Sequence, residues 1–245
     1  MHRGRGFFLI KKKETDIVMK RVPIAVYILT FVIIFAIALG VMAFMVMGRV
    51  STITKEAEKI AAMDISEDEI DTTIYSTGRY AVVESTMKGY IKTYIQNVNI
   101  LKNLKNDSTL QSMLGVSNIM TDGPEFTTSR SYIEKLRTKI SNTEASLKQE
   151  SKEENILSAF EEKGLNFFFN WIYKMEMIDK IGLNFYYSDE DVSSAAEQLG
   201  EMLDKRVEVL DFLTEHKNEW KCEENMLQFD TDELLNEYQT LIADL

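Results

Sequence analysis

The hydrophobic and polar positions divide the chain into one long apolar stretch and a series of amphipathic segments. No residue from Val22 to Met47 is charged. A membrane-spanning helix needs about 20 predominantly apolar residues, so this stretch is long enough to cross a bilayer. A helix of a water-soluble domain shows a polar face to solvent, and this stretch has none. The pattern therefore predicts a transmembrane helix over residues 22–48.

Beyond this stretch, apolar residues recur at the three- and four-residue spacing of amphipathic helices. We expect such helices over residues 66–104, 126–148 and 188–216, then a tight connection or short hairpin over 217–229 and a last helix over 231–245. The first helix has sustained heptad spacing, with apolar residues that include Tyr80, Met87, Tyr94 and Leu101. Heptads are typical of long, coiled-coil-like helices that bury their apolar stripes against one another, so the pattern predicts a helical bundle.

Three of the expected helix starts share one local pattern. A Ser or Asp stands three residues before an acid, and apolar residues flank the pair, which is the signature of a capping box with a hydrophobic staple. The cap side chain accepts free N–H groups of the first turn, and the acid favours the positive end of the helix dipole. The three pairs are Ser66 with Glu69, Ser188 with Asp191, and Asp230 with Glu233.

Residues 153–187 depart from the long-helix pattern. Gly164 and Gly182 each precede Leu-Asn-Phe, which predicts two short helices closed by glycine. Aromatic residues crowd the second half of this segment. We interpret them as the filler of a bundle core, and a docking surface or a contact with the membrane interface is the alternative. The candidate partner or ligand surface consists of Phe167, Phe168, Trp171, Tyr173, Tyr186 and Tyr187.

Charge sets the orientation of the predicted anchor. Residues 1–21 contain seven Lys or Arg and two Asp or Glu, whereas the whole chain has a net charge of −11. Basic flanks stay in the cytoplasm, so the acidic remainder is expected outside. The expected fold is all-α: one N-terminal transmembrane helix followed by an extracytoplasmic bundle of long amphipathic helices. Its parts are a basic cytoplasmic N-terminus (1–21), a transmembrane signal-anchor helix (22–48), a juxtamembrane linker or helix extension (49–65) and the extracytoplasmic helical domain (66–245).

Two alternatives concern the N-terminal region. Ala38 and Gly40 have the small-x-small spacing of a signal-peptidase site, but the apolar stretch exceeds the roughly 7–15 residues of a signal-peptide core, which favours an uncleaved anchor. A start at Met19 is the second alternative, because Met19-Lys20-Arg21 suits the start of a bacterial signal-anchor.

Residues suited to catalysis or metal binding are scarce. His2 and His216 are the two histidines, and Cys222 is the single cysteine. One histidine outside the membrane cannot build a histidine metal site or a Ser-His-Asp triad. The sequence also lacks a glycine-rich phosphate loop and a complete EF-hand pattern, and its acidic charge is unsuited to nucleic acid. We therefore expect no catalytic, cofactor-binding or metal-binding residues.

The sequence favours a membrane-anchored, non-enzymatic interaction or scaffold protein of the cell envelope. Its expected partners are the lipid bilayer, through residues 22–47, and a protein of the envelope. The alternative is an extracytoplasmic ligand-binding or sensor bundle, which would signal through a partner protein because residues 1–21 hold no output domain. An envelope enzyme that uses carboxylates alone is a third hypothesis. A homodimer, linked through Cys222 or packed through Ala36 and Gly40, is a further alternative.

Overall fold

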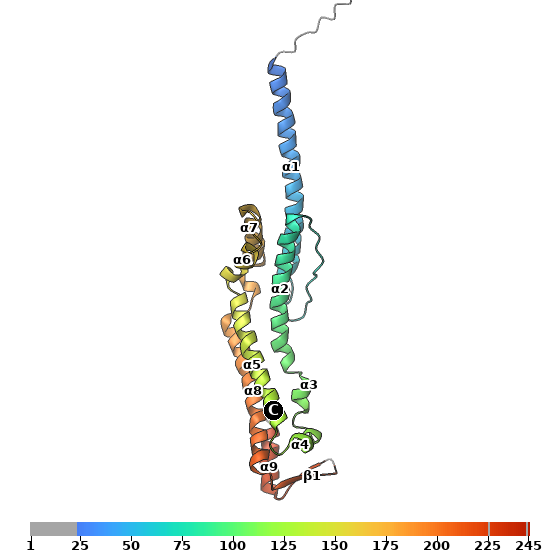
Figure 1. Ribbon diagram of the computed structural model, residues 1–245, viewed down its shortest axis with the longest axis vertical. Helices are drawn as coiled ribbons and strands as arrows, with labels where there is room; N and C mark the ends of the chain where they lie inside the picture. The colour runs from blue at the N-terminus through green and yellow to red at the C-terminus, as the bar shows by residue number, and fades with distance from the viewer. Residues whose placement is uncertain (1–23, 225, 244) are drawn as a thin grey trace, which may run out of the picture. The chain divides into compact units, whose positions relative to one another are not determined.

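The computed structural model describes residues 24–224, 226–243 and 245 (Figure 1). The predictions for residues 1–21, including the start at Met19, lie outside the described residues. The chain divides into two units, one ending at Met47 and one running from Gly48 to Leu245. The structure is mostly helical, with 75% helix and 4% strand. The prediction of a helical protein is therefore confirmed, although one small hairpin makes it not strictly all-α.

Helix α1 (Ile24–Ala61) contains the predicted anchor. From Ile28 to Met47 every side chain is exposed, and these side chains are almost all apolar. This helix is long and apolar enough to cross a membrane. From Gly48 onward the same helix is amphipathic, because Ile53, Ala57 and Ile60 are buried and charged residues separate them.

The second unit is built around three long helices, α2 (Arg79–Leu104), α5 (Thr127–Glu150) and α8 (Asp189–Glu215), which lie side by side (Figure 1). α5 is antiparallel to the other two, since its first turns contact the ends of both. Tyr132 donates to Asp107 just beyond α2, and Arg130 pairs with Asp211 near the end of α8. The shorter elements are α3 (Ser108–Ser112), α4 (Val116–Asp122), α6 (Glu153–Glu161), α7 (Phe167–Lys174), the π-helix η1 (Met175–Ile181), the 3₁₀ turn η2 (Leu183–Phe185), β1 (Trp220–Glu223), β2 (Met226–Phe229) and α9 (Asp232–Ala243).

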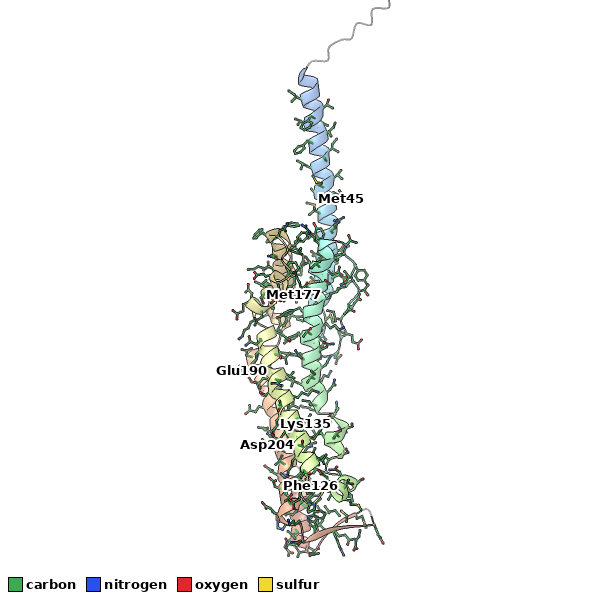
Figure 2. The ribbon with its side chains drawn as sticks, viewed as in Figure 1. Met45, Phe126, Lys135, Met177, Glu190 and Asp204 are labelled. Atoms are coloured by element: carbon green, nitrogen blue, oxygen red, sulfur yellow. The ribbon has the colours of Figure 1, made fainter. Side chains whose placement is uncertain are left out.

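The core follows the apolar stripes that the sequence predicts. All four heptad residues of α2 are buried: Tyr80, Met87, Tyr94 and Leu101. On α5 the buried stripe includes Leu136, Ile140 and Leu147, and on α8 it includes Val192, Leu199, Val209 and Leu213. Met177 and Phe126, labelled in the upper and lower parts of this unit in Figure 2, are fully buried. The heptad residues of α2 therefore form the buried stripe that their spacing predicts.

The predicted helix start at Ser66 is wrong. α2 begins at Arg79, and residues 62–78 form a non-helical segment, here called the strap. The Ser66 hydroxyl donates to the Asp64 carboxylate (2.7 Å) and so does not cap a helix. The strap also contains the β-branched run Thr72-Thr73-Ile74, which disfavours helix, and it ends at Gly78 with φ +60°.

The structure has helices at the other two predicted helix starts. Ser188 and Asp191 form the predicted capping box at the start of α8, which is confirmed. At α9 the cap is one residue later than predicted, because Leu234 N–H donates to the Thr231 hydroxyl (3.3 Å) rather than to Asp230.

The predicted hairpin over 217–229 is confirmed as the antiparallel pair β1–β2, with Trp220 opposite Phe229.

Candidate functional site

The six aromatic residues of the candidate surface do not lie together on one surface. Tyr173 and Tyr186 are buried, at 1% and 6% exposure. Three aromatic side chains of α7 are exposed: Phe167 at 83%, Phe168 at 38% and Trp171 at 48%. These three are called the aromatic surface below. The segment therefore supplies both core and surface, and neither interpretation alone describes it.

Local sequence explains why these three side chains share a face. Asn166 caps α7 by accepting the N–H of Phe169 (3.4 Å), which fixes where the helix begins. Residues four apart lie on the same face of a helix, so Phe167 and Trp171 are neighbours. The Phe168 and Trp171 rings stack at 6.2 Å. Phe169 points the other way and packs edge-on against Tyr80 of α2 (5.1 Å). The aromatic surface is thus fixed to the bundle by its own helix.

A shallow hollow of about 540 Å³ adjoins the aromatic surface. Phe167, Trp171, Lys174 and Asn170 are among the residues that line it. The Asn170 side-chain oxygen is buried without a hydrogen-bond partner. Lys174 forms an ion pair with Glu153 (3.4 Å) while staying about half exposed. The aromatic surface therefore has a polar margin with both a cation and a free acceptor.

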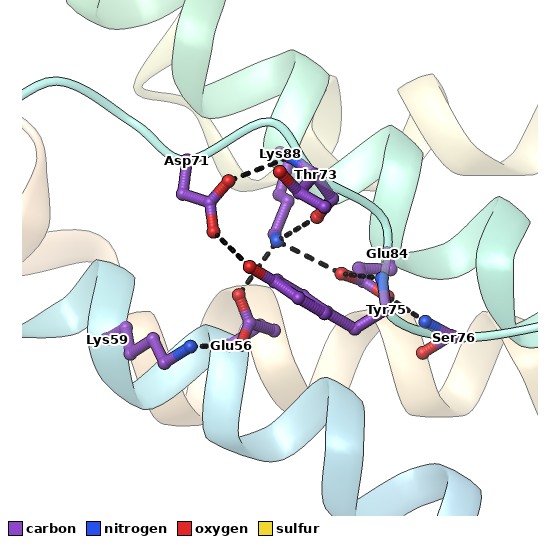
Figure 3. A network of polar contacts seen from close by, with 8 residues as sticks. All are labelled: Glu56, Lys59, Asp71, Thr73, Tyr75, Ser76, Glu84 and Lys88. Atoms are coloured by element: carbon purple, nitrogen blue, oxygen red, sulfur yellow. Dashed lines mark hydrogen bonds and ion pairs between the residues drawn. The ribbon is translucent and has the colours of Figure 1, made fainter.

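A network of buried charges lies beneath the strap (Figure 3). Lys88 is only 2% exposed, and its ammonium lies 2.7 Å from a Glu56 oxygen and 3.0 Å from a Glu84 oxygen. The same ammonium donates to the Thr73 carbonyl (2.6 Å). Glu56 belongs to α1, whereas Glu84 and Lys88 belong to α2. The network therefore joins α1, α2 and the strap through one buried cation.

Glu84 holds the strap in place. Its carboxylate accepts the backbone N–H groups of Tyr75 (3.0 Å) and Ser76 (2.7 Å), and the Tyr75 ring covers the Lys88 ammonium at 4.8 Å (Figure 3). Farther along, Lys102 donates to the Ser66 carbonyl. These contacts satisfy strap N–H groups that a helix would satisfy internally. They explain why the strap is extended.

Within this network, hydrogen bonds and opposite charges favour the charged forms of Glu84 and Lys88. Burial acts to raise the pKa of Glu84, but the Tyr75 and Ser76 N–H groups and the Lys88 ammonium outweigh it, and the pKa lies below its ordinary value. Burial acts to lower the pKa of Lys88, but Glu56 and Glu84 outweigh it and the pKa is raised. Every one of these charges is satisfied, so the network fastens the fold and offers no free acid or base.

An apolar groove of about 330 Å³ lies between α2 and α8. Its walls are mainly apolar, and the residues at its polar rim include Lys102, Lys105 and Asp191. Tyr187 lines this groove, so the sixth aromatic residue belongs to a different surface from Phe167. The apolar lining residues are Val98, Leu101, Leu147, Val192, Ala195 and Leu199.

The buried tyrosines form part of the core between α2 and the aromatic segment. The Tyr94 hydroxyl accepts the N–H of Tyr187 (2.7 Å), and burial raises the pKa of Tyr94 to about 12. Tyr90 donates to the Glu150 carbonyl (2.8 Å). The hydroxyls of Tyr173 and Tyr186 are buried without a partner. These groups stay protonated at neutral pH, so they act as apolar filler.

The remaining titratable candidates are not assembled into a site. His216 pairs with Glu219 (2.6 Å) at the end of α8. Cys222 is half-buried, and burial raises the pKa of its thiol. Within the part of the chain that the structure describes, no three His, Cys, Asp or Glu side chains are grouped as metal ligands.

Neither a family model, nor a curated protein, nor a solved structure matches this chain. Sequence inspection missed the network around Lys88. The signal in the sequence was the spacing of Glu84 and Lys88, which are four residues apart and directly follow the apolar residues Val83 and Met87.

Proposed function

We propose that the protein is a membrane-anchored, extracytoplasmic helical domain that acts as a non-enzymatic interaction or scaffold protein of the cell envelope. Residues 22–47 anchor it in the bilayer. The basic residues at positions 1–21 favour a cytoplasmic N-terminus, which puts the acidic domain outside.

The observation that carries this proposal is that the domain core includes residues that directly follow the apolar stretch. The first turns after the apolar segment are part of the domain core, because Ile53, Ala57 and Ile60 are buried. Glu56, on the same turns, is held by Lys88 of α2. Thr54 donates to Glu176 of η1 (2.5 Å), and Glu58 pairs with Lys180 (2.9 Å). The residues that directly follow the apolar stretch are thus part of the domain core, which suits a scaffold that works close to the bilayer.

The groove between α2 and α8 is the proposed face for an envelope protein. It is apolar, open to solvent and bordered by Lys102 and Lys105. Such a groove accepts the apolar face of a partner helix, with acidic partner residues opposite the lysines.

Site-specific photo-crosslinking in intact cells tests this face. A photoreactive residue in place of Ala195, in the groove, should give a discrete protein adduct. The matched control replaces Glu190, which is exposed on the same helix and does not line the groove. An adduct at Ala195 that disappears when Leu199→Lys is added supports the proposal. Equal labelling at both positions, or none at Ala195, contradicts it.

The groove also favours the second candidate function, a ligand-binding bundle. Its volume of about 330 Å³ is at the lower end of small-molecule sites, which span roughly 300–1,000 Å³. Native mass spectrometry of the full chain in detergent separates the two functions. A small molecule that copurifies with the protein and is lost in Ala195→Trp favours ligand binding, whereas a protein adduct without such a molecule favours the scaffold.

A further inference from the structure

We infer that the aromatic surface of Phe167, Phe168 and Trp171 is a second membrane contact, which enters the interface of the bilayer that holds the anchor. The occupant is a phospholipid surface. This inference rests on the membrane anchorage proposed above, and it adds a contact that the apolar helix does not make.

The first argument is the cost of the exposed side chains. Soluble surfaces leave single apolar residues exposed, but adjacent large aromatic side chains on one helix face mark an interaction site. Phe167, at 83% exposure, contributes almost its whole ring. The same helix buries Phe169, Ile172 and Tyr173 on its other side. The short α7 is therefore apolar nearly all round, although only one side of it has a protein neighbour.

The second argument is position within the domain. Arg49 is the second residue after Met47, the last of the apolar stretch. Its guanidinium lies over the Tyr80 ring (5.7 Å), Tyr80 contacts Phe169 (5.1 Å), and Phe169 contacts Phe168 (5.4 Å). A basic residue directly after a membrane span lies at the level of the lipid headgroups. Three successive contacts thus link Arg49, the residue at that level, to the aromatic surface.

The third argument is chemistry. Trp and other amphipathic rings are enriched where hydrocarbon meets headgroups. Lys174, one turn beyond Trp171, is about half exposed and pairs with the equally exposed Glu153 (3.4 Å), and its flexible side chain can exchange that partner for a lipid phosphate. Asn170, whose buried side-chain oxygen lacks a donor, is among the polar residues that line the adjoining hollow. An apolar centre with a basic and polar margin matches the layered chemistry of a bilayer surface.

Tryptophan fluorescence of the full chain tests this contact. The sequence has two tryptophans, Trp171 and Trp220. Trp220 is in β1, at the end of the domain away from α7 in Figure 1, and its indole N–H donates to the Leu213 carbonyl (2.7 Å). It is therefore an internal control within the same molecule.

The protein is reconstituted into phosphatidylcholine vesicles, with or without bromine atoms on the acyl chains near the headgroups. The emission of Trp171 is the difference between the emission of the wild type and that of Trp171→Phe. It is also measured directly in Trp220→Phe, in which Trp171 is the remaining tryptophan. We expect brominated lipid to remove most of the Trp171 emission and to leave the Trp220 emission unchanged. The double variant Phe167→Ser, Phe168→Ser should restore the Trp171 emission while helix content by circular dichroism stays the same.

Resistance of the reconstituted protein to alkaline extraction reports the anchor separately. If the protein resists extraction and Trp171 is not quenched, the second contact is refuted and the anchor stands. If alkali removes the protein, the anchorage that both proposals need is refuted. A cellular photo-crosslink from position 167 to a protein instead of to lipid would also overturn the inference.

Discussion

Replacing Lys88 with Met removes the single cation at the centre of the buried network. Methionine retains a side chain of similar length that prefers helix, so the change mainly removes charge. Glu84, at 0% exposure, then loses the cation beside it, whereas Glu56, at 5%, keeps its ion pair with the exposed Lys59 (2.5 Å). The strap loses the bond from Lys88 to the Thr73 carbonyl as well.

The magnitude follows from burial. Removing one partner of a buried ion pair costs roughly 3–5 kcal/mol, because it leaves an uncompensated buried charge. Lys88 contacts two carboxylates, at 2.7 and 3.0 Å, so we expect Lys88→Met to fall in this range. A whole domain is stable by only about 5–15 kcal/mol. The variant should therefore unfold at a much lower denaturant concentration.

The dependence on pH has a definite sign. In the wild type, the folded-state pKa of Glu84 is lowered, so its contribution is present above its ordinary pKa and is lost as pH falls through the lower value. The folded-state pKa of Lys88 is raised, so its contribution is present below 10.5 and is lost as pH rises through the higher value. Without Lys88 the buried Glu84 carboxylate gains a proton more readily. Lys88→Met should thus lose less stability at pH 5 than at pH 7.

The assay is urea unfolding of the full chain in detergent, followed by circular dichroism. Lys92→Met is the matched control, since Lys92 is exposed on the same helix, one turn later. We expect the control to change stability by no more than about 0.5 kcal/mol, and Glu84→Gln added to Lys88→Met to recover part of the loss. The reasoning is refuted if Lys88→Met and Lys92→Met lose the same stability at pH 7.

Three further changes probe other parts of the molecule. Ser188→Ala removes the hydroxyl that accepts the Asp191 N–H (3.1 Å) at the start of α8. Thermal unfolding should show a loss of about 1 kcal/mol in stability. The control is Ser141→Ala, at an exposed position in the middle of α5, and a similar loss there would contradict the capping role. Burial raises the pKa of Glu176 in the folded state, so stability falls as pH rises from the ordinary pKa through the raised one. Glu176→Gln should remove that fall and flatten the pH profile of urea midpoints between pH 5 and pH 8, and an unchanged profile would sink this explanation. The half-buried Cys222 thiol, whose pKa burial raises, should react with iodoacetamide at pH 8 more slowly than glutathione, and equal rates would show that burial does not protect it.

Sequence reasoning succeeded where the signal is local or strongly periodic. The capping box at Ser188 needs only a four-residue pattern, and the heptads of α2 repeat over Tyr80, Met87, Tyr94 and Leu101. The apolar stretch of α1 is recognisable by length alone. The hairpin followed from loose alternation around Trp220 and Phe229, because a break between two helical patterns leaves few other structures.

It failed where distant residues override a local preference. The cap pattern at Ser66 is outweighed by Glu84 and Lys88, which bind the strap in an extended form. Lys88 itself finds its partner Glu56 on a different helix, and no local pattern contains that pairing. Around Phe167 and Trp171 the aromatic residues follow no helical spacing that would separate a buried face from an exposed one. Their burial in the structure was needed to identify the aromatic surface.

Impermeant labelling of single cysteines tests the central claim most directly, namely that residues 22–47 cross the membrane with the helical domain outside. In a Cys222→Ser background, Lys135→Cys places a thiol on an exposed position of α5, and Lys12→Cys places one in the basic N-terminus. A maleimide that cannot cross membranes is added to intact cells and to lysed cells. The account predicts that position 135 is labelled before lysis and position 12 only after it. Labelling of position 12 in intact cells, with position 135 protected until lysis, would reverse the orientation and contradict the proposed extracytoplasmic function.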